Sequence, residues 1–120
     1  MAKILVVDDS MTNRQVIVSY LSSLGHSTVE AGDGEEGEAV AYKEMPDFII
    51  LDVVMPKKNG FEACRALRKS GKFDNTPIVM LTSKDQDSDK FWGMKQGATE
   101  YLTKPFSETD LSNVLKKYLK

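Results

Sequence analysis

The sequence predicts an α/β fold in which one open, doubly wound parallel sheet of five βα units carries helices on both faces. Short apolar runs alternate with helical patterns five times along the 120 residues, and this rhythm is typical of βα units. Two of the runs, 48–51 and 78–81, are continuous apolar stretches of strand length, as expected for parallel strands covered on both faces. Because βαβ crossovers are right-handed in nearly all cases, successive units build one sheet with helices on either side.

The five expected strands form a central group and an edge group. Segments 3–7, 48–51 and 78–81 are rich in Val, Ile and Leu and are expected in the middle of the sheet. Segments 27–31 and 100–103 are more polar, and a strand that is exposed on one side tolerates polar residues better than a central strand does. We therefore expect these two strands at the two edges.

The expected helices follow the strands in order. In the first, apolar residues recur with helical spacing before Gly25, which suits the left-handed end of a helix. Asp33 with Glu36 forms a capping signature for the second, although two glycines weaken it. Cys64 lies on the apolar stripe of the third helix, so we interpret it as a core residue rather than a reactive thiol. This third helix is expected after the Asn59 cap, the fourth over Asp87 to Gln96, and the fifth after the Ser107 and Asp110 pair.

Composition and charge fit one globular domain and exclude several classes of function. The chain has 41% hydrophobic and 28% charged residues, so we expect a single domain over 1–120 with one core. A net charge of −2 without a basic stripe argues against direct nucleic-acid binding. The apolar runs are far shorter than the ~20 residues of a membrane span, and the N-terminus lacks a signal-peptide pattern. The expected location is the cytoplasm.

Polar side chains collect where four of the five expected strands end. Asp8 and Asp9 follow the first strand, Asp52 follows the third, Thr82 follows the fourth and Lys104 follows the fifth. The carboxyl ends of parallel strands meet at one edge of the sheet, which is where such folds bind their ligands. We therefore expect a functional site at this edge.

Three carboxylates at one edge need positive charge nearby. Each close pair repels by up to ~4 kcal/mol at 4 Å if the effective dielectric is near 20, and one lysine cannot offset all three. An all-oxygen ligand set without His or Cys favours Mg²⁺ or Mn²⁺ over Zn²⁺. The alternative is that Asp8 and Asp9 only cap the first helix.

A carboxylate beside a hard cation, an ammonium and a hydroxyl has the parts needed for phosphoryl transfer. In that interpretation Asp52 is the nucleophile, Asp9 with Asp8 behind it holds the metal, and Lys104 and Thr82 contact the phosphoryl oxygens. Pro105 follows Lys104 directly, and we predict a cis peptide bond between them, a plain loop turn being the alternative.

Taken together, these residues resemble the receiver domain of response regulators, the phosphorylated half of two-component signalling. The resemblance covers the whole chain and implies a flavodoxin-like fold with strand order 2-1-3-4-5, and no output domain after Lys120. The motifs that carry it are Val6-Val7-Asp8-Asp9-Ser10, Leu51-Asp52-Val53-Val54-Met55-Pro56 followed by Gly60, Leu81-Thr82-Ser83, and Lys104-Pro105.

The resemblance also implies roles and partners. It makes Asp52 the phosphoacceptor, Asp9 and Asp52 direct Mg²⁺ ligands, Asp8 a ligand through water, Val54 a ligand through its backbone carbonyl, Thr82 and Tyr101 the switch pair, and Lys104 the phosphate-contacting lysine. The phosphoryl donor would be a sensor histidine kinase or a phosphotransfer protein, and the chain would signal as a monomer to a downstream protein. Segments 84–93 and 101–105 further resemble stand-alone regulators of twitching motility and phototaxis. Lys58 departs from the family pattern, because many relatives carry an apolar residue there.

Three rival functions remain to be weighed. An aspartyl-phosphate phosphatase places a second Asp two residues after the nucleophile, where this chain has Val54. A nucleotide or flavin carrier would want a glycine-rich first turn, whereas this turn begins with two aspartates. A degenerate receiver would keep the fold and act only as a scaffold.

The helix expected at 87–96 suggests where a signal leaves the domain. On a helical wheel Phe91, Met94 and Ala98 share one face, which we expect toward the core, and Trp92 lies roughly 130° from its centre. The Trp92 ring either folds back over Gly93 or the next element, or anchors a partner. Phosphorylation would then reshape the surface formed by the fourth helix, the fifth strand and the fifth helix.

Overall fold

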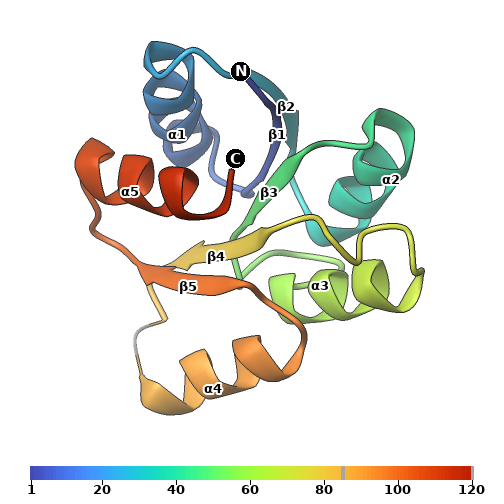
Figure 1. Cartoon of the computed structure of the whole chain (residues 1–120). Helices are drawn as coiled ribbons and strands as arrows, with labels where there is room; N and C mark the ends of the chain where they lie inside the picture. The colour runs from blue at the N-terminus through green and yellow to red at the C-terminus, as the bar shows by residue number, and fades with distance from the viewer. Residues whose placement is uncertain (85, 120) are drawn as a thin grey trace.

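The structure, a computed structural model that describes residues 1–84 and 86–119, is a five-stranded parallel sheet with helices on both faces (Figure 1). The strand order is β2-β1-β3-β4-β5, which confirms the predicted fold class. The strands are β1 (Lys3–Val7), β2 (Ser27–Ala31), β3 (Phe48–Leu51), β4 (Ile78–Thr82) and β5 (Glu100–Thr103). The helices are α1 (Met11–Ser23), α2 (Gly34–Glu44), α3 (Gly60–Lys69), α4 (Asp87–Lys95) and α5 (Glu108–Tyr118).

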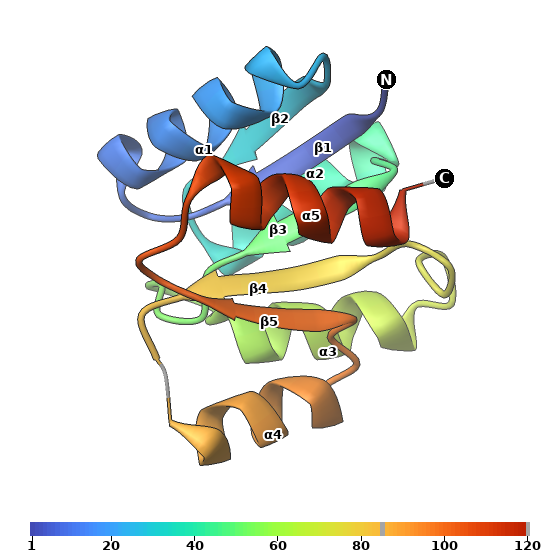
Figure 2. The ribbon, with the colours of Figure 1, turned by 60° about the vertical axis from the view of Figure 1, so that its left-hand side comes forward.

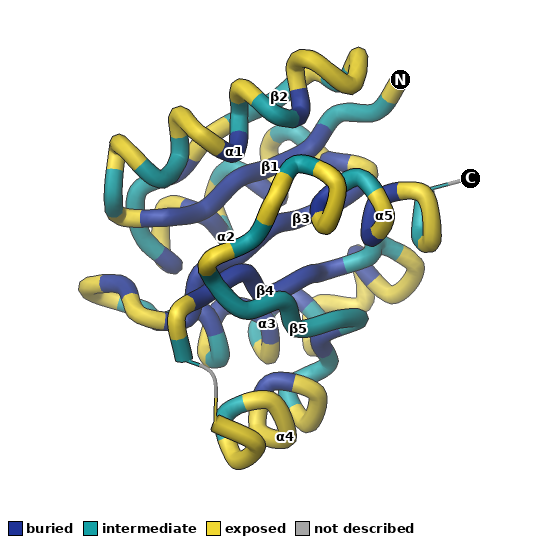
Figure 3. The backbone as a smooth tube through the Cα atoms, turned by 90° about the vertical axis from the view of Figure 1, so that its left-hand side faces the viewer, coloured by how far each residue is buried: buried dark blue, intermediate teal, exposed yellow. Residues whose placement is uncertain are grey.

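Two apolar layers flank the sheet. Helices α1 and α5 cover one face, whereas α2, α3 and α4 lie on the other (Figure 2). Alternate residues of each central strand serve the two layers: Ile4 contacts the α1 and α5 side, and Leu5 contacts the α2 and α3 side. Strands β1, β3 and β4 are therefore buried on both faces, while β2 and β5 are more exposed at the edges, as predicted (Figure 3).

Side-chain caps fix where the helices begin. The Asp33, Asn59 and Ser107 side chains each accept a hydrogen bond from a backbone N–H of the first helical turn, so all three predicted caps are confirmed. Ser10 caps α1, since its hydroxyl accepts from Asn13 N at 3.2 Å. The longest described helix has 13 residues, and no helix in the described part of the chain is long and apolar enough to span a bilayer.

Helix α4 contacts the sheet through a different face from the one that the helical wheel predicted. The side chains of Phe91 and Met94 are 63% and 49% exposed, so their expected core position is wrong. The only buried residue of α4 is Gly93, which lies against the Tyr101 ring and the Met80 sulfur. A residue without a side chain allows the helix to approach the sheet closely at that point, and this contact turns Phe91 and Met94 outward. Trp92 is 51% exposed, as the wheel predicted.

Arg68, a partly buried residue of α3, links this helix to its surroundings through several hydrogen bonds. The Arg68 guanidinium donates to backbone carbonyls of Phe73, Thr76 and Gly97 and to the Thr99 hydroxyl, with distances of 2.8 Å to Thr76 O and 2.9 Å to Gly97 O. One side chain thus ties α3 to the loops before β4 and β5. Cys64, on the same helix, is fully buried as predicted, and burial raises the pKa of its thiol to about 11.

Replacing Arg68 should therefore destabilise the fold strongly. In Arg68→Ala, several acceptors lose a charged donor, and we expect the free energy of unfolding to fall by about 2–4 kcal/mol. Arg65→Ala is the matched control, because Arg65 is exposed on the same helix and should change stability by less than about 0.5 kcal/mol. Urea unfolding followed by circular dichroism measures both, and equal losses would show that the contacts of Arg68 contribute nothing specific.

Candidate functional site

The backbone places the polar residues at one edge of the sheet. The parallel register pairs Val7 with Leu51 and Leu51 with Met80, so β1, β3 and β4 end side by side. Hydrogen bonds beyond the strands continue this alignment: Asp52 N donates to Val7 O at 2.9 Å, and Lys104 N donates to Thr82 O at 2.8 Å. The residues that follow each strand are therefore held at defined positions.

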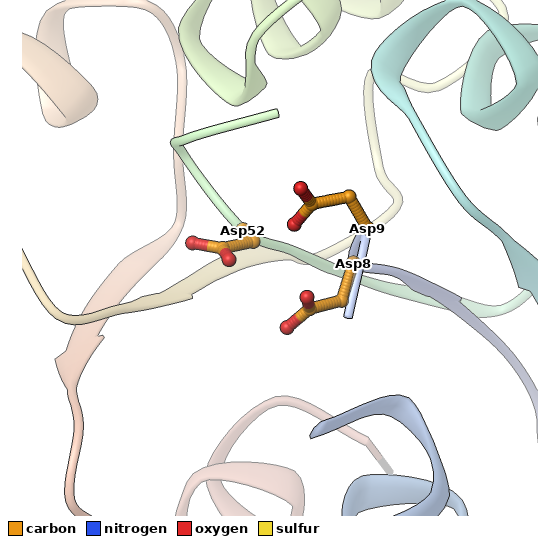
Figure 4. Close-up of side chains that lie close together, drawn as sticks. All are labelled: Asp8, Asp9 and Asp52. Atoms are coloured by element: carbon orange, nitrogen blue, oxygen red, sulfur yellow. The ribbon is translucent and has the colours of Figure 1, made fainter. Parts of the chain in front are cut away.

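Three carboxylates converge at this edge. Asp8, Asp9 and Asp52 each offer one oxygen, and these oxygens all lie within 4.8 Å of one another. Figure 4 shows the three side chains extending from the ends of β1 and β3 into the same space. Asp8 and Asp52 are 1% and 8% exposed, whereas Asp9 is open to solvent.

Lys104 supplies positive charge to this cluster. Its Nζ lies 3.1 Å from Asp8 Oδ2 and 3.5 Å from Asp52 Oδ2. The Lys104–Pro105 peptide bond is cis, as predicted. Three carboxylates against one ammonium leave two negative charges at the cluster, and the ligand atoms are all oxygen. This set of ligand atoms fits a hard divalent cation such as Mg²⁺ or Mn²⁺.

Asp8 and Asp9 are neighbours in the sequence but have different structural roles. Asp8 Oδ1 accepts from Ser10 N at 2.9 Å while Oδ2 faces Lys104, so both oxygens of Asp8 contact the protein. The N-cap of α1 is Ser10, which means that neither aspartate caps the helix. Asp9 is thus the exposed carboxylate of the cluster, and capping does not explain it.

Sequence reasoning missed one residue that supports the cluster from outside. Arg14 Nη1 donates to the backbone carbonyl of Asp8 at 2.7 Å, and Arg14 Nε pairs with Glu30 at 3.0 Å. The guanidinium therefore links α1 and β2 to the turn that carries the aspartates. One feature of the sequence could have drawn attention to this residue: Arg14 is the sole basic residue of α1, Met11–Ser23.

The two residues of the predicted switch pair, Thr82 and Tyr101, both form hydrogen bonds with the backbone of Lys84. Thr82 ends β4 and is fully buried, and its Oγ1 accepts from Lys84 N at 3.4 Å. Tyr101 is half-buried on β5, and its hydroxyl donates to Lys84 O at 2.8 Å. Both side chains thus contact the chain at Lys84, directly after β4. Trp92 lies nearby in sequence on α4, with half of its surface exposed.

The loop after Asp52 is anchored on α2. Val54 lies in this loop with its side chain 59% exposed, and the ligand role of its carbonyl stays a prediction. Lys58 forms an ion pair and hydrogen bond with Glu38, and this bond raises the pKa of the lysine. The Lys58 carbonyl also closely approaches Gly34. The unusual lysine is thereby accounted for, since it holds the loop against α2.

Three comparisons of this chain with known proteins agree with one another. The family model of the response regulator receiver domain matches residues 4–116. Protein PilH of Pseudomonas aeruginosa is 43% identical over 119 residues, which cover 99% of this chain and 98% of that protein. The chain spans less than half the length of several other curated relatives that it matches.

Two solved structures illustrate the similarity. The chemotaxis response regulator CheY4 of Vibrio cholerae has a TM-score of 0.93 at 41% identity, with 99% of each chain covered. The receiver domain of the sensor histidine kinase PA1611 from Pseudomonas aeruginosa, with a magnesium ion coordinated in its active-site cleft, has a TM-score of 0.91 at 30% identity, covering 98% of this chain and 96% of that one.

The charge excess at the cluster predicts an unusual effect of removing Asp9. Asp9→Ala deletes a repelling carboxylate that caps nothing, so we expect the metal-free protein to gain about 1 kcal/mol, or about 3–5 °C in melting temperature. The same change should weaken Mg²⁺ binding. Thermal unfolding in EDTA and titration calorimetry with Mg²⁺ measure the two effects.

The control for this substitution is Ser10→Ala, which removes the α1 cap and should lower stability by about 1 kcal/mol in EDTA. If Asp9→Ala also lowers the melting temperature in EDTA, Asp9 supports the turn and the charge argument is wrong.

Proposed function

This chain belongs to the response regulator receiver domain family, and we propose that it is a signalling switch that accepts a phosphoryl group on Asp52 and passes the signal on by binding another protein. The observation that carries this proposal is the position of Asp52, which lies with Asp8, Asp9 and Lys104 at the carboxyl edge of the sheet. The family match fills residues 4–116, so we assign positions 1–120 to one receiver domain.

The proposed reaction is an attack by an Asp52 oxygen on phosphorus. The donor is the phosphorylated histidine of a sensor kinase or phosphotransfer protein: the new O–P bond forms, the N–P bond breaks, and the imidazole keeps the electron pair and takes up a proton. Asp52 Oδ1 accepts from Val53 N at 2.7 Å, which orients the carboxylate. Lys104, 3.5 Å from Oδ2, is placed to contact a phosphoryl oxygen.

A divalent cation fits the same arrangement. Mg²⁺, or Mn²⁺, held by Asp8, Asp9 and Asp52 with the Val54 carbonyl as a further ligand, would offset the negative charge of the carboxylates and of the phosphoryl oxygens. Support comes from the three converging oxygens and from the magnesium ion in the PA1611 receiver domain. Because the chain modifies itself and not a separate substrate, we regard it as a switch and not as a conventional enzyme.

We propose that the signal leaves through Thr82 and Tyr101. A phosphoryl group adds about −1.5 to −2 charges and would draw the buried Thr82 hydroxyl away from Lys84 N. Tyr101 contacts the other side of the same residue, so the loop after β4 and the surface of α4, β5 and α5 would change together. The target would be a protein that binds this surface. Similarity to a chemotaxis regulator supports a role in motility or taxis, and we propose a cytoplasmic location.

Phosphorylation at Asp52 can be tested by mass spectrometry. Incubation with Mg²⁺ and a small acyl phosphate should add the mass of one phosphoryl group, and EDTA should prevent this addition. Asp52→Asn keeps the shape of the side chain and should abolish the gain, because the amide is not a nucleophile for this reaction. No added mass on the wild-type chain, with donor and metal present, would favour the scaffold function instead.

The exposed ring of Trp92 gives a second test. Phosphorylation should change the fluorescence of Trp92, which is the chain's single tryptophan. Trp92→Ala should leave phosphate uptake at Asp52 unchanged. In a pull-down, however, this variant should no longer retain the proteins that bind the wild-type chain only when it is phosphorylated. Tyr42→Ala, an exposed aromatic on α2, is the matched control and should retain them. Full retention by Trp92→Ala would show that this ring does not anchor a partner.

A further inference from the structure

We infer that Gly93 is a positioning residue for Tyr101: its missing side chain opens a slot in α4 that holds the tyrosine ring while the hydroxyl binds the Lys84 carbonyl. The functional meaning of this slot rests on the proposed role of Tyr101 in the switch. The slot itself follows from contacts between three elements, α4, β4 and β5.

The space at Gly93 is already occupied. A Cβ atom added there would lie 2.9 Å from Tyr101 Cδ2, 3.1 Å from Tyr101 Cε2 and 3.0 Å from Met80 Sδ. Carbon atoms make favourable contacts at about 3.5–4.0 Å, so a methyl group would displace its neighbours. The Met80 sulfur lies near the end of a flexible side chain and can move. The tyrosine ring is wide and rigid, and it is held at its far end.

The far end of Tyr101 is fixed by its hydrogen bond. The hydroxyl donates to Lys84 O at 2.8 Å, and the residue is paired in register with Met80 across β4 and β5. The ring therefore cannot slide along α4 without stretching this bond. Any side chain at position 93 would force a choice between the ring position and the hydrogen bond.

The geometry also explains the presence of a poor helix former in α4. Glycine within a helix is unfavourable compared with alanine. Gly93 lies in the last turn of α4, and its carbonyl accepts hydrogen bonds from Gln96 N at 3.1 Å and from Ala98 N at 3.2 Å. The helix thus keeps its backbone hydrogen bonds around Gly93. The helix preference is given up at a position where an added Cβ atom would meet the Tyr101 ring.

Opposite effects of one substitution in two backgrounds test this inference. In the wild-type background Gly93→Ala should lower the melting temperature by several degrees, because the methyl group meets the ring. In a Tyr101→Ala background the clash is gone, and the same change should raise the melting temperature, because alanine favours the helix. Tyr101→Phe keeps the ring, so Gly93→Ala should again be destabilising there; this arm remains informative if Tyr101→Ala fails to fold.

A spectroscopic measurement distinguishes positioning from a general loss of stability. With 3-fluorotyrosine incorporated, the fluorine signal of Tyr101 is identified as the one missing in Tyr101→Phe. Gly93→Ala should shift this signal and leave those of Tyr20, Tyr42 and Tyr118 unchanged. Ser88→Ala is the matched control, since it adds helix preference at an exposed position of α4 and should not shift the Tyr101 signal.

The outcomes separate this inference from the proposed function. Neither melting temperatures nor fluorine spectra require phosphate or metal, so they test the slot even if Asp52 takes up no phosphoryl group. A loss of stability in Gly93→Ala that persists unchanged with Tyr101→Ala would mean that Met80 or the backbone carries the effect, and the inference would be wrong. An unshifted Tyr101 signal in Gly93→Ala would also overturn it.

Discussion

The Lys104 ammonium lies between Asp8 and Asp52 and thereby joins the ends of β1 and β3 to the loop that follows β5. Both carboxylates are almost fully buried, and a buried charge without a partner is strongly unfavourable. The lysine is in turn held by its backbone N–H, which donates to the carbonyl of Thr82. One side chain therefore connects the acidic cluster to the residue pair that we propose as the switch, and the remaining negative charge accounts for the affinity for a divalent cation that we expect.

The central strands and α4 differ in how well they are covered. The strands that carry Asp8, Asp52 and Thr82 are covered by helices on both sides, and Arg68 ties α3 to the loops at the opposite end of β4 and β5. Asp8 and Asp52 consequently follow strands that are covered on both faces. Trp92 and its neighbours on α4 lie on the least covered part. A site at the ends of covered strands, next to a helix that buries one residue, suits the proposed switch, which would change its surface while the acidic site keeps its position.

The sequence predicted the sheet, its edges, three helix caps and the meeting of the polar residues, because those features follow from alternating apolar runs and from the parallel direction of the strands. It did not predict how α4 faces the sheet. Hydrophobic periodicity counts apolar side chains, and Gly93 has none, so the position that contacts Tyr101 gave no signal and Phe91 and Met94 were assigned to the core instead. Arg14 and Arg68 were missed for a related reason: their polar character suggests exposure, whereas their guanidinium groups bind backbone carbonyls that only the folded chain brings together.

Helix α4 buries one residue, whereas α5 buries Leu111, Val114 and Leu115. The free energy that keeps a segment closed rises with the apolar contacts it buries, so we expect α4 to open more readily than α5. Its amide hydrogens would exchange with solvent through local opening events, while those of the central strands would exchange only when the whole domain unfolds. Separation of this helix from the sheet would expose little apolar surface, because Gly93 is the single residue that α4 buries, and the carboxylates and Lys104 lie outside this helix.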